Sequence, residues 1–142
     1  MPRDARAYLA DILDACDAIV LAVHGLDLAG YRSNRLIRSS VEREFTIIGE
    51  AMTALAHTAP EAFASITQTR RIVDFRNQLT HEYPSVNDML VWGIIDRDVP
   101  VLRRECTALM DGLARTIHEA PPASTIWSTA TALHDRGAPQ RV

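Results

Sequence analysis

Residues 34–58, NRLIRSSVEREFTIIGEAMTALAHT, carry the pattern that decides the fold. Apolar side chains recur there at three- and four-residue spacing, the period of one face of an α-helix. A helix is therefore expected to begin near Ser33 or Asn34 and to end before Pro60. Gly49 lies within it, at a point where another helix is expected to pack closely. The apolar stripe consists of Leu36, Ile37, Val41, Phe45, Ile48, Met52 and Leu55.

Three further stretches share this helical period. Gly25 follows the first of them as a natural C-cap, and Pro84 prevents simple continuation of the second. Pro100 lies within the third and is expected to kink or split it. The stretches cover about residues 4–24, 67–82 and 87–117.

The connections contain Gly30 and a short turn at 61–63, and no alternating apolar-polar run of the strand type occurs. The sequence therefore predicts an all-α protein, an up-and-down four-helix bundle with a proline-kinked last helix. Residues 1–120 are expected to form this bundle. Residues 121–142 are expected to be a C-terminal tail with one weakly amphipathic stretch.

Composition limits the class of protein. A chain of 142 residues with 47% hydrophobic residues is expected to form one domain with a real core. Cys16 and Cys106 lie in helix-periodic stretches, which favours small buried hydrophobes in a reducing compartment over a disulfide. No apolar run approaches the roughly 20 residues needed to cross a bilayer, and the N-terminus is polar, so a cytoplasmic protein is expected.

Residues 76–83, Arg-Asn-Gln-Leu-Thr-His-Glu-Tyr, gather groups that can hold a phosphodiester and move protons around it. Arg76 would neutralise phosphate oxygens, and His81 can exchange a proton near neutral pH. On a helix Asn77 and His81 share a face, so Asn77 is a supporting residue that could orient His81 or a phosphate oxygen. Tyr83 returns to the Arg76 face.

A structural interpretation of the same residues stays open. Arg76 could pair with a carboxylate such as Glu50, His81 could cap the helix, and Tyr83 could be a half-buried aromatic residue. Other charged residues are expected to be solvated, with an ion pair between Arg70 and Asp74 and with Asp96, Asp98 and Asp111 at the surface. Arg70, Arg71 and Arg76, joined by Arg43, would form a local basic surface despite a net charge of −3.

The octet resembles the R-x4-H-x-Y motif of the HepT-like toxins, a branch of the HEPN superfamily. Residues 8–13, 41–51 and 98–102 look like further segments of that family, in the right order. The resemblance spans about residues 4–118. It covers the predicted bundle and leaves the predicted tail outside.

The resemblance implies a small helical ribonuclease that forms a homodimer, with Arg76 and His81 as the catalytic pair facing a cleft between subunits. It implies cleavage of RNA without a metal or other cofactor, by attack of the 2′-hydroxyl on the adjacent phosphate. The histidines are scattered without metal-binding spacing, in agreement with this. The implied partner is a minimal nucleotidyltransferase antitoxin that transfers AMP onto Tyr83.

Two other classes of function stay open. The chain could be a non-catalytic helical module whose motif binds a nucleotide or docks the transferase, without turning over RNA. It could also be a purely structural bundle in which the octet is a helix end.

Overall fold

The computed structural model describes residues 3–67, 69–81 and 87–119, and these ranges contain six helices and no strand. The expected all-α class is confirmed. Four helices are long and two are short. The long helices are α1 (Ala5–Ala22), α3 (Arg35–Thr58), α5 (Thr69–His81) and α6 (Asp88–Glu119); the short helices are α2 (Leu28–Ser33) and α4 (Pro60–Ala64).

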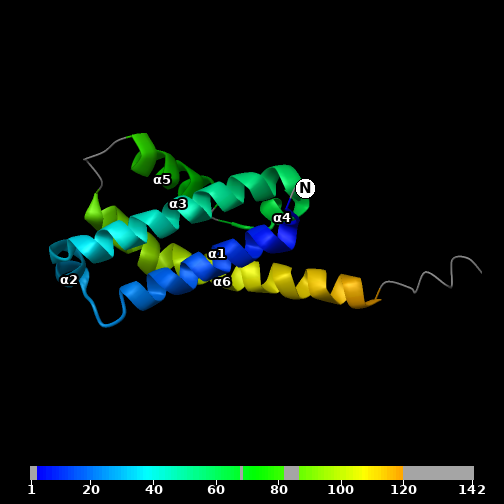
Figure 1. The fold of residues 1–142 in the computed structure, drawn as a ribbon, viewed down its shortest axis with the longest axis horizontal. Coiled ribbons are helices and arrows are strands. Elements are labelled where there is room, and N and C mark those ends of the chain that lie inside the picture. The colour runs from blue at the N-terminus through cyan, green and yellow to red at the C-terminus, as the bar shows by residue number, and fades with distance from the viewer. Residues whose placement is uncertain (1–2, 68, 82–86, 120–142) are drawn as a thin grey trace, which may run out of the picture. The chain divides into compact units, whose positions relative to one another are not determined.

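The chain divides into two compact units after Gly112. The first unit contains α1 to α5 and α6 as far as Gly112, and consecutive long helices in it run in opposite directions (Figure 1). The second unit begins at Leu113, and its described part is the end of α6, up to Glu119. The predicted tail, residues 121–142, lies outside the described residues.

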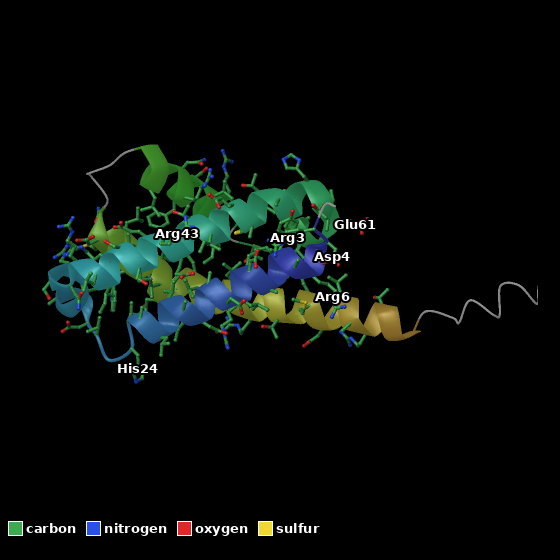
Figure 2. The ribbon with its side chains drawn as sticks, in the orientation of Figure 1. Arg3, Asp4, Arg6, His24, Arg43 and Glu61 are labelled. Carbon is green, nitrogen blue, oxygen red and sulfur yellow. The ribbon has the colours of Figure 1, made fainter. Side chains whose placement is uncertain are left out.

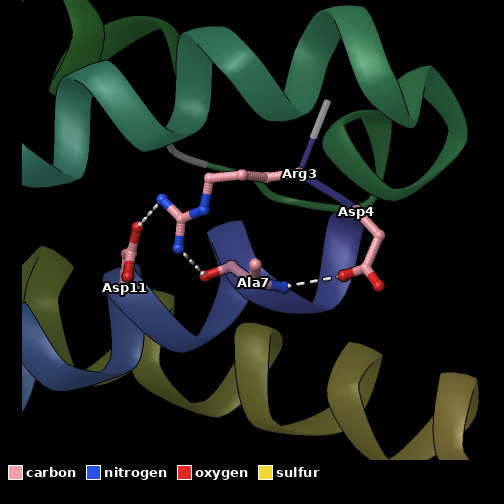
Figure 3. A network of polar contacts seen from close by, with 4 residues as sticks. All are labelled: Arg3, Asp4, Ala7 and Asp11. Carbon is pink, nitrogen blue, oxygen red and sulfur yellow. Dashed lines mark hydrogen bonds and ion pairs between the residues drawn. The ribbon is translucent and has the colours of Figure 1, made fainter. Parts of the chain in front are cut away.

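α1 begins at a side-chain cap, which Figure 3 shows in close-up. The Asp4 carboxylate accepts a hydrogen bond from the backbone N–H of Ala7 at 3.0 Å. Arg3 adds an ion pair with Asp11, in which Nη1 lies 2.6 Å from Oδ2, and its Nη2 donates to the Ala7 carbonyl. Such a cap satisfies an N–H group that has no partner inside the helix and stabilises the helix by about 1 kcal/mol.

Caps also start two other helices. Asp27 accepts from the N–H of Gly30 at 2.8 Å, and Asn34 accepts from the N–H of Ile37 at 3.1 Å. The predicted start of the central helix near Ser33 or Asn34 is therefore confirmed, with Asn34 as its N-cap. Gly25 adopts a φ of +77° just after α1, a left-handed conformation that glycine adopts without strain.

α3 lies at the centre of the first unit. It packs along α1 and also contacts α2, α4 and α5. Phe45 of α3 and Phe75 of α5 meet edge to face with ring centroids 5.1 Å apart, which ties the motif helix to the core. Cys16 and Cys106 are fully buried free thiols, as the sequence predicted.

Two features of the fold differ from the sequence prediction. Residues 28–33 and 60–64 form short helices where only connections were expected. Helices of six and five residues are too short to show an apolar period, although the cap at Asp27 and Pro60 at the first turn are ordinary start signals. α6 also continues without interruption through Pro100, so the expected split does not occur.

The helices in the described ranges include none that is both long and apolar enough to span a bilayer.

Candidate active site

The motif octet begins within α5, and its last two residues lie outside the described residues. α5 ends at His81, so Arg76 and Asn77 lie on its last turns and position 81 is its final residue. The side chain of His81 and all of Tyr83 lie outside the described residues. The structure therefore brings Arg76 and Asn77 together and confirms the helical spacing between positions 77 and 81.

Arg76 packs against α3 at Gly49. A Cβ built at position 49 would come within 2.5 Å of the Cβ of Arg76 and closer still to its Cγ. Real Cβ atoms essentially never approach another atom so closely. The arginine stem therefore occupies the space that any side chain at position 49 would need, and the predicted close packing at Gly49 is confirmed.

The guanidinium of Arg76 is held between two polar groups. Its Nη2 lies 3.7 Å from Oε1 of Glu50, and its Nη1 donates to Oδ1 of Asn77 at 3.2 Å. The Arg76 side chain is 29% exposed and that of Glu50 is 56% exposed, so the pair lies at the surface. Water screens such a pair, so its contribution to stability is small. Glu50 was an expected partner of Arg76, and this expectation is confirmed.

α6 braces α5 from another side. Nε of Arg71 lies 3.1 Å from Oδ2 of Asp98, although the two atoms are not aligned for a hydrogen bond. In a second contact with α6, the carboxylate of Glu105 accepts from the N–H of Thr67 at 2.9 Å and from its hydroxyl at 2.7 Å. These contacts fix the chain as it enters the motif helix.

Two sequence expectations about charge were wrong. Asp98 was expected to be solvated, but it is only 3% exposed and pairs with Arg71. Within the described ranges Arg70 makes no ion pair, so the expected contact with Asp74 is not formed. A signal for Asp98 existed, because it follows Val91 by seven residues and Ile94 by four and so falls on the apolar stripe of α6.

The expected basic surface is partly formed. Arg70 and Arg71 are exposed neighbours on α5, whereas the stem of Arg76 faces α3. Arg43 is exposed on α3 (Figure 2). Each of the paired arginines has a carboxylate beside it, which lowers the net positive charge of this region.

Fold and site together define a small helical protein with an Arg-x4-His motif that closes its fifth helix. Residues 12–109 match the family model described as "Ribonuclease HepT-like", and the chain belongs to this family. The resemblance inferred from the octet is therefore confirmed at the level of the family.

Two curated relatives illustrate the match. The chain is 32% identical over 103 residues to "Putative RNase MJ1380" of Methanocaldococcus jannaschii. The aligned residues cover 72% of this chain and 94% of that protein. It is 27% identical over 108 residues to "Putative RNase TTE0752" of Caldanaerobacter subterraneus subsp. tengcongensis, covering 76% of this chain and 96% of that protein. The search of solved structures returned no match.

Proposed function

We propose that the chain is an endoribonuclease that cuts RNA with Arg76 and His81 and needs no metal ion. The observation that carries the proposal is the placement of Arg76 in a member of the HepT-like family: a packed stem carries a guanidinium at the surface, on the helix that ends at His81. A fixed cation at this position would stabilise the charge that develops on a phosphorane-like transition state.

The proposed reaction is an internal transfer at phosphorus. A base removes the proton of the ribose 2′-hydroxyl, the 2′-oxygen bonds to the adjacent phosphorus, and the bond from phosphorus to the 5′-oxygen breaks. An acid protonates the departing 5′-oxygen, which leaves a 2′,3′-cyclic phosphate and a 5′-hydroxyl. Asn77 would keep the Arg76 guanidinium oriented through their hydrogen bond.

The reaction needs one base and one acid, whereas each chain supplies a single motif histidine. We therefore propose a two-fold homodimer that brings two copies of His81 to one cleft. Gel filtration with light scattering tests the dimer, and cleavage in the presence of excess EDTA tests independence from metal ions.

We further propose that the chain is the cytoplasmic toxin of a toxin-antitoxin pair, and that a minimal nucleotidyltransferase is its antitoxin. In the neutralising step the Tyr83 hydroxyl would attack the α-phosphorus of ATP, pyrophosphate would leave, and the hydroxyl proton would pass to solvent. The added AMP would put negative charge near Arg76 and repel RNA phosphate. Mass spectrometry of the chain expressed with and without the transferase tests this step.

The second candidate is a non-catalytic helical module that binds a nucleotide or docks the transferase. The contact between Glu50 and Arg76 fits this candidate, because the motif arginine has a carboxylate partner in the absence of RNA. This candidate predicts partner binding without RNA turnover at any enzyme concentration. Cleavage that is lost in His81→Ala would exclude it.

A further inference from the structure

A cavity between α5 and the first part of α6 is not used by the proposed chemistry. Its volume is about 480 Å³, which is within the range of small-molecule binding pockets. The cavity combines an apolar floor with a charged and polar wall. It is lined by Thr67, Arg70, Arg71, Asp74, Phe75, Gln78, Leu90 and Ile94.

The apolar floor suits one face of a nucleobase. Ile94 is fully buried and Phe75 is 4% exposed, so both are fixed by the core. Leu90 of α6 also lines the cavity and is 37% exposed. A base in the cavity would contact mainly Leu90, which is the exposed one of the three side chains, and would be partly removed from water there.

The polar wall suits the rest of a nucleotide. Arg70, Asp74 and Gln78 follow one another at four-residue spacing, so they form one stripe along α5. Arg70 is exposed and makes no ion pair within the described ranges, which leaves its guanidinium able to take a phosphate oxygen. Gln78 offers an amide, and Asp74 offers an acceptor for a hydroxyl or an amino group.

The stripe leads along α5 toward the motif histidine. Position 81 follows Gln78 by three residues, which is about 4.5 Å along the axis of a helix. Arg71, which lines the cavity, is held by its ion pair with Asp98, and Asp98 is buried in α6. The cavity therefore lies along the same helix as the motif, a short distance from position 81.

We propose that this cavity is an RNA subsite that holds one nucleotide next to the cut, with Arg70 on its phosphate and Gln78 on its base. The proposal rests on the proposed ribonuclease function and deepens it. Single-stranded RNA would then be recognised on the side of α5 that carries Arg70, whereas the side chain of Arg76 extends from α5 toward α3.

The test is binding of a fluorescent 2′-O-methyl RNA hexamer to the full chain, measured by anisotropy at several salt concentrations. The hexamer lacks the attacking hydroxyl, so binding is measured without cleavage. Arg70→Gln should weaken binding about tenfold and reduce the slope of log Kd against log salt by about 0.7, since one phosphate contact to a single strand is lost. Gln78→Ala should weaken binding about threefold with an unchanged slope.

Arg104→Gln is the matched control, because Arg104 is also exposed but lines a different cavity, between α1 and α6. Equal affinities and equal slopes for Arg70→Gln and Arg104→Gln would overturn the subsite. The same result is expected if the cavity binds a protein partner instead of RNA. Cleavage of ordinary RNA by the unaltered chain is measured in parallel. If Arg70→Gln binds the hexamer like the unaltered chain, and the unaltered chain cleaves RNA, only the subsite is refuted. If Arg70→Gln weakens binding but the unaltered chain cleaves no RNA, the cavity binds single-stranded RNA and the proposed enzyme is refuted.

Discussion

The stem of Arg76 lies directly against Gly49, in space that a side chain at position 49 would fill. The contact joins α5 to α3 at the motif itself, so the position of the guanidinium depends on how closely these two helices approach. The lack of a side chain at position 49 of α3 thus sets where the Arg76 guanidinium of α5 lies.

Gly49→Ala should therefore damage both stability and the candidate site. The new methyl group must displace Arg76 or push α5 away from α3, and overpacking of this kind costs about 1–3 kcal/mol of unfolding free energy. Urea unfolding followed by circular dichroism measures the loss. RNA cleavage should fall further than the loss of folded protein explains, because Arg76 is moved.

Gly93→Ala provides the matched control. Gly93 lies inside α6 and has nothing within 4 Å of the position its Cβ would take. Alanine should stabilise the helix there by about 0.5–1 kcal/mol and leave cleavage unchanged. If Gly49→Ala behaved like Gly93→Ala, the close contact between Arg76 and α3 would be wrong.

Helix periods and breaker residues were enough to predict the four long helices, the buried cysteines and the close packing at Gly49. These features depend on local spacing, and the apolar stripe of α3 is buried from Val41 to Leu55 as its period requires. Leu36, which was expected to belong to the stripe, is 83% exposed. The motif, together with the matching segments, was also enough to find the family. Arg76, Asn77 and Glu50 do meet, as their positions suggested.

Partners across helices could not be deduced in the same way. The contacts of Arg71 with Asp98 and of Thr67 with Glu105 join residues far apart in sequence, and they depend on the rotation of α6 against α5. The four-residue spacing on a helix favoured an ion pair between Arg70 and Asp74. The structure instead pairs Arg71 with Asp98 of another helix. The short helices at 28–33 and 60–64 carry too few turns to reveal a period.

The two carboxylates that pair with α5 should differ in their contribution to stability. Asp98→Asn should lower the free energy of unfolding by about 1–3 kcal/mol, because it breaks an ion pair whose acid is 3% exposed. Glu50→Gln should change it by less than about 0.5 kcal/mol, because the Glu50 side chain is 56% exposed and its pair is screened by water. Thermal and urea unfolding of both variants give the comparison, and equal effects would contradict the assigned burial.

The cysteines should be unreactive in the folded protein. Both are fully buried, and burial raises the pKa of each thiol from 9.0 to about 12 by disfavouring the thiolate. A colorimetric thiol reagent at pH 8 should therefore label neither Cys16 nor Cys106 until denaturant is added. Two thiols per chain should then react, and rapid labelling of the folded protein would show that the core is open.

The same shifts predict a loss of stability in alkali. A raised pKa means that the folded state keeps its thiol protons above pH 9, where the unfolded chain has begun to release them. The contribution of the thiols to stability is thus complete below pH 9 and is lost as the pH rises through about 12. Urea midpoints measured from pH 8 upward should fall, more steeply for the unaltered chain than for a Cys16→Ala variant. Parallel curves would exclude a contribution from this thiol.

The central claim is that Arg76 and His81 cut RNA, and the most direct measurement compares the unaltered chain with His81→Ala on one RNA substrate. Removal of a general acid or base should lower the cleavage rate by at least about a hundredfold. The products of the unaltered chain should carry 2′,3′-cyclic phosphate and 5′-hydroxyl ends, and circular dichroism and gel filtration should be the same for both proteins. Cleavage by His81→Ala at the rate of the unaltered chain would contradict the assignment of the active site.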